Sequence, residues 1–253
     1  MKTETKIYVG IGLDFETGGL ECQDCACTQI ALQAIRLDTW ETLERYVAYL
    51  SPYCRKETGA AKRKVLRTRQ EQKQEENSEL MKYDAAALNY SGITMEQLYA
   101  QGVDLKAVAT STLDLARRNT LSKGQQCKPI LIGQNIPFDI GFLQQLMNYA
   151  GLVSDFEKTF AGTKDYYGNF QPYYIDTLFL GRLAFAHDPE VTSYKLELMA
   201  ARLGVELDDA HDAAADVTAT LDVTGAYAGR LRNAEGGRIS TEKQERTRTY
   251  FKI

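Results

Sequence analysis

The sequence has no long apolar run, few prolines, a single tryptophan and only two histidines among 253 residues. No stretch approaches the roughly 18 uninterrupted apolar residues of a membrane-spanning helix, so a transmembrane protein is not expected. Residues 1–6 lead directly into a strand-like segment without the apolar block of a signal peptide. Hydrophobic residues still make up 44% of the chain, which is enough for a core and excludes disorder as the overall state. We therefore expect a globular, cytoplasmic protein.

The sequence has no excess of positive charge either. It contains 30 Lys and Arg and 34 Asp and Glu, which gives a formal net charge of −4. This balance argues against a protein that coats nucleic acid by bulk electrostatics. It leaves a nuclease open, since divalent cations in an acidic cleft reverse the local sign of charge. The five cysteines are an odd number, which fits a reducing compartment better than a disulfide framework.

The periodicity of apolar residues indicates an α/β fold with a mixed sheet, because three strands are followed by alternating helices and strands. The expected strands are 6–13, 28–37, 44–50, 129–133 and 173–175, and the expected helices are 103–118, 140–150, 176–184, 194–203 and 213–231.

Composition suggests one domain over residues 1–232 with an insertion at about 53–84 and a polar tail at 233–253. Residues 55–82 carry nine Lys and Arg against five Asp and Glu, a local charge of +4. We interpret the insertion as a solvated helix or a mobile lid, with a basic arm that grips a nucleic-acid backbone as the alternative.

Two carboxylates, Asp14 and Glu16, close the first apolar strand and are followed by Thr17, Gly18, Gly19 and Leu20. Side chains at i and i+2 of a strand point to the same face. Adjacent like charges are costly unless cations offset them, and divalent metal ions would do so. Taken alone, the pattern could equally be a strand that ends in a polar turn.

Two further acidic segments lie at the starts of predicted helices. Asp139 follows a short strand in Asn135-Ile136-Pro137-Phe138-Asp139, where helix capping is the simple interpretation. His211 precedes Asp216 by five residues at the start of the last helix. Each of the three acidic segments has an ordinary structural explanation by itself. No such explanation accounts for the occurrence of all three in one chain in this order.

Together these segments resemble the DEDDh branch of 3′–5′ exonucleases, which includes proofreading subunits of replicative polymerases, ribonuclease T and oligoribonuclease. Asp14–Leu20 is similar to the family's first motif, Asn135–Asp139 to its second and His211–Asp216 to its third. Weaker similarities lie at Gly92-Ile93-Thr94 and at Ile175-Asp176-Thr177-Leu178. The resemblance covers about residues 6–230 and implies a ribonuclease H-like fold.

The resemblance also implies two-metal-ion phosphodiester hydrolysis, with Mg²⁺ or Mn²⁺ held by Asp14, Glu16, Asp139 and Asp216. His211 would be the general base that takes a proton from the attacking water. The product would be a nucleoside 5′-monophosphate. Substrate-binding residues implied by position are Thr17, Gly18, Gly19, Leu20, Asn135 and Phe138, with core packing as the alternative for Leu20 and Phe138.

We expect 3′ ends of single-stranded DNA as the substrate, with roles in proofreading or DNA repair implied by the relatives. The alternatives are an RNA exonuclease of the ribonuclease T or oligoribonuclease kind and a non-catalytic nucleic-acid-binding module. A polymerase could dock on the C-terminal tail.

Two other features are open to more than one interpretation. Cys22, Cys25 and Cys27 could bind zinc if Cys54 supplied a fourth ligand, but we favour ordinary thiols. The segment 166–174 holds five aromatic residues in nine positions, which could stack single-stranded bases or pin a loop onto the domain. We expect pinning for Tyr173 and Tyr174 and leave both interpretations open for Tyr166, Tyr167 and Phe170.

Overall fold

The computed structural model describes residues 6–56, 79–206 and 213–233. Its centre is a five-stranded sheet in the order β3-β2-β1-β4-β7, which confirms the predicted mixed α/β fold. β1 pairs antiparallel with β2 and parallel with β4, and β4 pairs parallel with β7. The strands are β1 (Val9–Thr17), β2 (Cys27–Arg36), β3 (Thr42–Tyr49), β4 (Ile130–Gly133) and β7 (Tyr174–Asp176).

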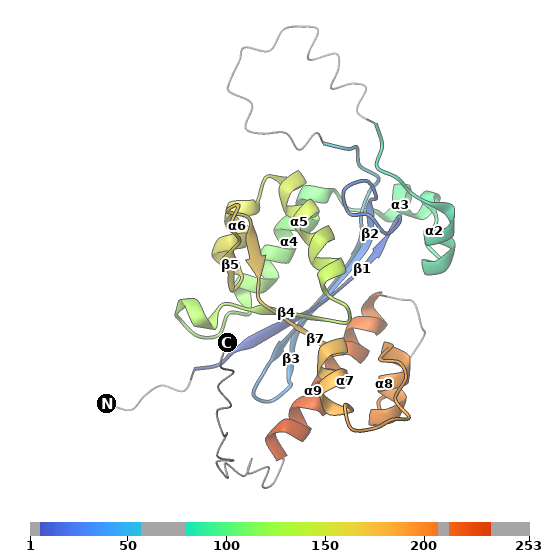
Figure 1. Cartoon of the computed structure of the whole chain (residues 1–253). Helices are drawn as coiled ribbons and strands as arrows, with labels where there is room; N and C mark the ends of the chain where they lie inside the picture. The colour runs from blue at the N-terminus through green and yellow to red at the C-terminus, as the bar shows by residue number, and fades with distance from the viewer. Residues whose placement is uncertain (1–5, 57–78, 207–212, 234–253) are drawn as a thin grey trace, which may run out of the picture.

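Helices cover both faces of this sheet (Figure 1). One layer contains α4 (Leu105–Arg118), α5 (Pro137–Ala150) and α6 (Val153–Thr159), and it encloses the larger apolar core. The opposite layer contains α7 (Thr177–Ala184), α8 (Leu196–Leu203) and α9 (Ala213–Asn233). The remaining elements are α2 (Ala85–Ser91), α3 (Met95–Gln101), the 3-10 turn η1 (Gln125–Cys127) and a hairpin of β5 (Gly162–Lys164) and β6 (Phe170–Pro172).

The sequence of β1 determines which layer each of its residues faces. Its large apolar side chains at alternate positions, such as Leu13 and Phe15, pack into the core under α4 and α5. The intervening residues, which point to the other face of the sheet, are Gly10, Gly12, Asp14 and Glu16. At Gly12 an added Cβ would lie 2.9 Å from side-chain atoms of both Val217 and Leu221, so α9 approaches the strand closely. The two carboxylates therefore lie on the strand face that α9 covers.

Boundaries differ from the sequence expectation at two places that concern the site. β1 does not end before Asp14 but continues to Thr17, paired with β2 throughout. Helix α5 begins at Pro137, three residues before the predicted start at Ile140. Proline is favoured in the first turn of a helix because its missing N–H would have no intrahelical partner there. The hairpin β5–β6 is an addition, since we predicted no strands between residues 162 and 172.

The described ends of the insertion are attached to the domain by backbone hydrogen bonds. Met81 N donates to Tyr53 O, so the two ends pair with each other. Ala26 N donates to Lys82 O, and Asp84 N donates to Gly18 O at 2.8 Å. The insertion therefore leaves and re-enters the domain beside the glycines of the first motif.

Candidate active site

The site forms where one parallel strand of the sheet is shorter than its neighbour. The pairing of β1 with β4 ends at Gly12 and Ile132, whereas β1 runs on to Thr17. On that side the backbone N–H of Phe15 donates at 2.9 Å to the carboxylate of Asp139 instead of to a strand. An opening in the sheet results, which residues from both helical layers can reach.

Three of the four predicted acidic residues converge at this opening. Asp14, Glu16 and Asp216 each offer a carboxylate oxygen, and these oxygens lie within 4.8 Å of one another. Asp216 is in the first turn of α9, one residue before the Val217 side chain that packs on the sheet. All three side chains are half-buried. Such close negative charges favour a bound cation, and hard carboxylate oxygens suit Mg²⁺ or Mn²⁺.

The fourth acidic residue, Asp139, lies beside this cluster from the opposite helical layer. It is only 4% exposed, although it is a potentially charged side chain. Burial raises the pKa of Asp139 to about 8, the N–H of Phe15 opposes that shift, and the charges of Glu16 and Asp176 add to it. Capping is not its role, because it is the third residue of α5 and its carboxylate bonds the backbone of β1. Four carboxylates from β1, α5 and α9 thus share one region.

The glycines of the first motif form a compact loop at the edge of the site. Gly18 N donates to Ala26 O at 2.8 Å, and the hydroxyl of Thr17 donates to Gly19 O at 2.8 Å. Gly19 has φ = 153°, and an added Cβ would lie 2.6 Å from Cys25 Sγ. Leu20, which follows, is 80% exposed. Core packing is therefore wrong for Leu20, and its side chain is available to a ligand.

The second motif supplies a further exposed polar side chain and a packing residue. Asn135 is exposed and has φ = 52°, a left-handed conformation that asparagine tolerates better than most residues. Phe138 is half-buried, with its ring 5.1 Å from that of Phe142. Phe138 thus combines core packing with partial exposure beside Asp139.

One residue near the site, Asp176, was named in the sequence only within a weak family similarity and was given no role in the site. Asp176 caps α7, accepting from Leu178 N at 2.9 Å. It also accepts from Asn135 N at 3.0 Å and so fixes the turn that carries the second motif. Its charge contributes to the raised pKa of Asp139. The resemblance at residues 175–178 was the signal that could have placed it here. The predicted base, His211, lies outside the described residues.

The cysteines do not assemble a metal site in the part of the chain that the structure describes. There, the only group of three or more Cys, His, Asp or Glu ligands is the acidic cluster. Cys25 and Cys27 are buried, and burial raises the pKa of the Cys27 thiol to about 12. Cys54 is exposed. The interpretation of the cysteines as ordinary thiols is therefore favoured over zinc.

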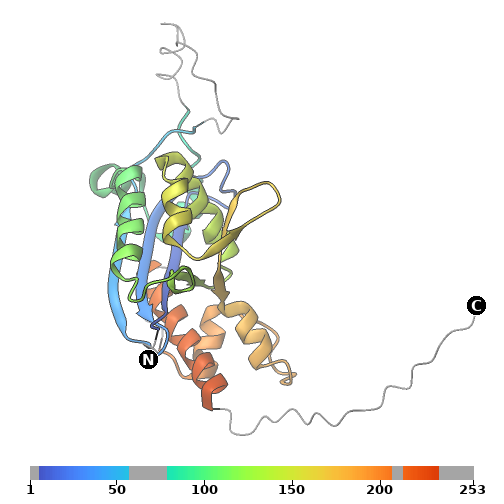
Figure 2. The same ribbon diagram turned by 90° about the vertical axis from the view of Figure 1, so that its left-hand side faces the viewer.

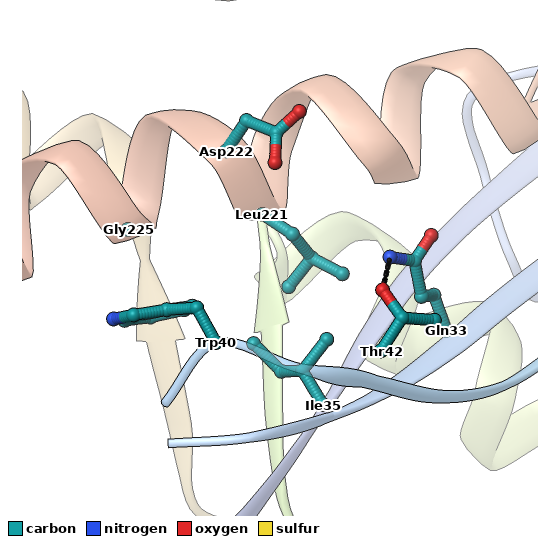
Figure 3. Close-up of a pocket in the computed structure, with 7 residues that line it drawn as sticks. All are labelled: Gln33, Ile35, Trp40, Thr42, Leu221, Asp222 and Gly225. Carbon is teal, nitrogen blue, oxygen red and sulfur yellow. Dashed lines mark hydrogen bonds between the residues drawn. The ribbon is translucent and has the colours of Figure 1, made fainter. Parts of the chain in front are cut away.

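A pocket of about 250 Å³ lies on the α9 face but contains none of the predicted site residues. It is enclosed by Trp40, Leu221, Gly225 and neighbouring side chains, with Gln33 donating to Thr42 at 2.9 Å (Figure 3). Its one acidic residue, Asp222, is six positions after Asp216 on α9, about 9 Å along the helix axis. The pocket is thus separate from the acidic cluster.

The comparison with protein families agrees with this geometry. The sequence pattern described as "Exonuclease" (RNase T) matches residues 76–224, which is more than half of the chain. The chain belongs to the exonuclease family. The prediction of a 3′–5′ exonuclease of the DEDD type, and hence of a hydrolase, is confirmed at family level. The match includes Asp139 and Asp216, while the first motif lies before it. No curated protein sequence matches the chain.

Solved exonuclease structures share the fold of this exonuclease-family chain. Escherichia coli exonuclease I bound to a dT13 oligonucleotide is 20% identical with a TM-score of 0.60, over 89% of this chain and 41% of that one. A second exonuclease I structure is 21% identical with a TM-score of 0.61, over 89% and 42% of the two chains. The chain thus spans about two fifths of the length of these solved proteins. No helix in the described ranges is long and apolar enough to cross a bilayer.

Proposed function

We propose that the chain removes nucleoside 5′-monophosphates from the 3′ ends of single-stranded DNA by metal-dependent hydrolysis. The observation that carries the proposal is the meeting of Asp14, Glu16 and Asp216 within 4.8 Å, with Asp139 bonded to the strand between the first two. Two Mg²⁺ or Mn²⁺ ions held by these carboxylates would orient the attacking water and stabilise the leaving 3′ oxygen. The exonuclease I structures with dT13 and dA16 oligonucleotides support DNA as the substrate class.

The other predicted residues are assigned by position around this cluster. In the proposal, the loop at Thr17, Gly18 and Gly19 holds the terminal sugar, and the exposed Leu20 contacts the terminal base. Asn135 and Phe138 contact the same nucleotide from the turn before α5. His211 takes the proton from water; this role remains a prediction.

The test is hydrolysis of 5′-labelled DNA and RNA oligonucleotides by the full chain with Mg²⁺ and, separately, with Mn²⁺. A ladder that shortens from the 3′ end is expected, and EDTA should abolish it. Asp216→Asn should reduce the rate at least about 100-fold, because it removes one of the negative charges that would hold the metal ions against the reacting phosphate. Asp222→Asn is the matched control on the same helix and should keep the parent rate. Equal activity of the Asp216 and Asp222 variants would refute the assignment of the cluster.

The same experiment separates the alternatives. Faster cleavage of RNA than of DNA would favour an exonuclease of the ribonuclease T or oligoribonuclease kind. Binding of oligonucleotides without hydrolysis under either metal would favour a non-catalytic binding module.

Partners and location are finer proposals. One solved exonuclease I structure is a complex with an SSB C-terminal peptide, which shows a protein partner for that enzyme. We propose that the tail, of which only Asn233 is described, docks a partner such as a polymerase. Deletion of residues 234–253 should then leave hydrolysis by the isolated chain unchanged. Cytoplasmic location, the single domain over 1–232 and a role in proofreading or repair stay predictions.

A further inference from the structure

The hairpin β5–β6 carries two tyrosines that the fold leaves exposed. Tyr166 is 96% exposed and Tyr167 is 84% exposed, and their rings contact each other edge to face with centroids 5.3 Å apart. The hairpin stands away from the helical layers in Figure 2. Tyrosine is enriched at binding surfaces, because its ring supplies apolar area while its hydroxyl stays hydrated.

The hairpin is held firmly at its base and at its tip. At the base Phe170 is buried, with its ring 5.0 Å from that of Phe156, and its carbonyl accepts from Gln144 of α5 at 3.0 Å. Near the tip the carboxylate of Asp165 accepts from Tyr167 N at 2.9 Å and from Asn169 N at 2.8 Å. A firmly held hairpin presents its rings at little entropic cost on binding.

The chain connects this hairpin directly to the candidate active site. β6 leads into the edge strand β7, whose last residue, Asp176, bonds Asn135 of the second motif. Tyr174 is two residues before Asp176, so both side chains lie on the same face of β7. Tyr174 pairs with Leu131 of β4, whose side chain belongs to the apolar core under α5, so this is the face toward the α5 layer. Tyr174 is itself partly exposed. Exposed aromatic side chains therefore occur along the segment that leads away from the site.

We propose that Tyr166 and Tyr167 stack on bases of a single strand whose 3′ end lies in the active site, with Tyr174 between them and the site. The inference rests on the proposed function and extends it to a second contact. Aromatic stacking is tolerant of sequence, and it suits a chain whose net charge of −4 gives little general attraction for phosphates. Tyr167 is nine residues from Asp176, and nine residues of extended chain span at most about 30 Å. Stacked nucleotides are spaced about 3.4 Å apart, so the two rings contact bases no more than about nine nucleotides from the 3′ end.

Binding to a 20-nucleotide thymidine oligomer, measured in EDTA to prevent hydrolysis, tests this contact. The double variant Tyr166→Ala/Tyr167→Ala should bind about tenfold more weakly than the parent, whereas Tyr166→Phe/Tyr167→Phe should bind like the parent. Tyr99→Ala, at an exposed tyrosine of α3, is the matched control and should have no effect. Replacing the nucleotides at positions 3–9 from the 3′ end with abasic ones, two at a time, should weaken binding by the parent to the same extent at one pair of positions. The same replacement should leave binding by the double alanine variant unchanged. With Mg²⁺, cleavage of a dinucleotide should be the same for parent and variant, because its single phosphodiester bond lies in the active site and the proposal places Tyr174 between that site and the hairpin.

The outcomes separate the hairpin from the proposed function. A parent that neither binds nor cleaves either oligomer overturns both. A parent that binds and cleaves, with an alanine variant that matches the Tyr99 control, overturns the hairpin contact alone and leaves the tyrosines to a protein partner. Loss of affinity that abasic nucleotides do not reproduce overturns stacking as its cause.

Discussion

Substitution of Gly12 by alanine tests whether the close approach of α9 to β1 holds the acidic cluster together. A Cβ at this position would lie 2.9 Å from Val217 Cγ1 and from Leu221 Cδ1, and 3.0 Å from Leu221 Cγ. Carbon atoms prefer separations of about 3.5–4.0 Å, so helix and strand must separate by roughly 0.5–1 Å unless both side chains move. Val217 is adjacent to Asp216, so this separation would displace Asp216 from Asp14 and Glu16.

The expected magnitudes follow from this displacement. Overpacking of a closely packed core destabilises a protein by about 1–3 kcal/mol. Replacing glycine by alanine also reduces the entropy of the unfolded chain, which stabilises the protein by about 0.4–1 kcal/mol. The free energy of unfolding should therefore fall by about 1–2 kcal/mol. A misplacement near 1 Å of a catalytic group can lower a rate about 100-fold. We expect Gly12→Ala to lose activity far more than stability, with kcat reduced at least about tenfold.

The assay is steady-state hydrolysis of a labelled oligonucleotide at saturating Mg²⁺, alongside urea denaturation of the same preparation. Gly229→Ala is the matched control, since the same substitution on α9 meets no atom within 4 Å. The control should keep full activity and gain up to about 1 kcal/mol from helix propensity. Full activity of Gly12→Ala, whatever its stability, would show that α9 tolerates displacement and that glycine does not position Asp216.

Two further predictions concern the buried thiol and the network under the insertion. Tyr53→Phe should lower the free energy of unfolding by about 2 kcal/mol in urea titrations. The Tyr53 hydroxyl accepts a hydrogen bond from Cys27 N and donates one to Gln145 Oε1, both at 2.7 Å, and phenylalanine makes neither. Tyr99→Phe is the control and should have no effect. Burial raises the pKa of Cys27 to about 12, so above about pH 9 the unfolded chain loses a proton that the native chain keeps. Stability should therefore fall between about pH 9 and pH 12, by up to about 4 kcal/mol from this group. Cys27→Ala should flatten that part of the pH profile; an identical profile would contradict the shift.

The sequence predicted the sheet well because its strands are strongly apolar and the motifs follow them. The expected strands and helices all occur in the expected order, although α2, α3 and α6 were not predicted. The helix expected to end at residue 203 does end there, with Gly204 in a left-handed cap. The end of β1 was placed too early, because Asp14 and Glu16 look like a polar turn when hydrophobicity alone is considered. The start of α5 was placed too late because Asp139 was interpreted as the residue that caps the helix. The proline at 137, which is favoured in the first turn of a helix, was the better signal for the start.

Distances within the site could not be predicted from spacing along the chain. Asp14 and Asp216 are about 200 residues apart, and their approach depends on the glycines of β1, which carry no chemical signal of their own. The role of Asp176 was not predicted beyond the weak family similarity at residues 175–178. One of its carboxylate oxygens accepts hydrogen bonds both from helix α7 and from the turn at Asn135, and spacing along the chain does not reveal such a shared contact. The hairpin was not predicted, and its two strands have only three residues each.

The position of the cluster follows from the unequal lengths of two parallel strands. β4 stops at Gly133 and turns into α5, while β1 continues, so the N–H of Phe15 is left for a side chain to satisfy. The residue that satisfies it, Asp139, comes from the layer that packs on the side chain of Phe15. The next carboxylates along the strand, Asp14 and Glu16, face the other layer, from which Asp216 comes. Because β1 contacts both layers, a small change in its register would shift Asp14 and Glu16 relative to Asp139 of α5 and Asp216 of α9. A site of this construction needs a rigid strand more than rigid loops, and pairing of β1 with β2 along its whole length provides that rigidity.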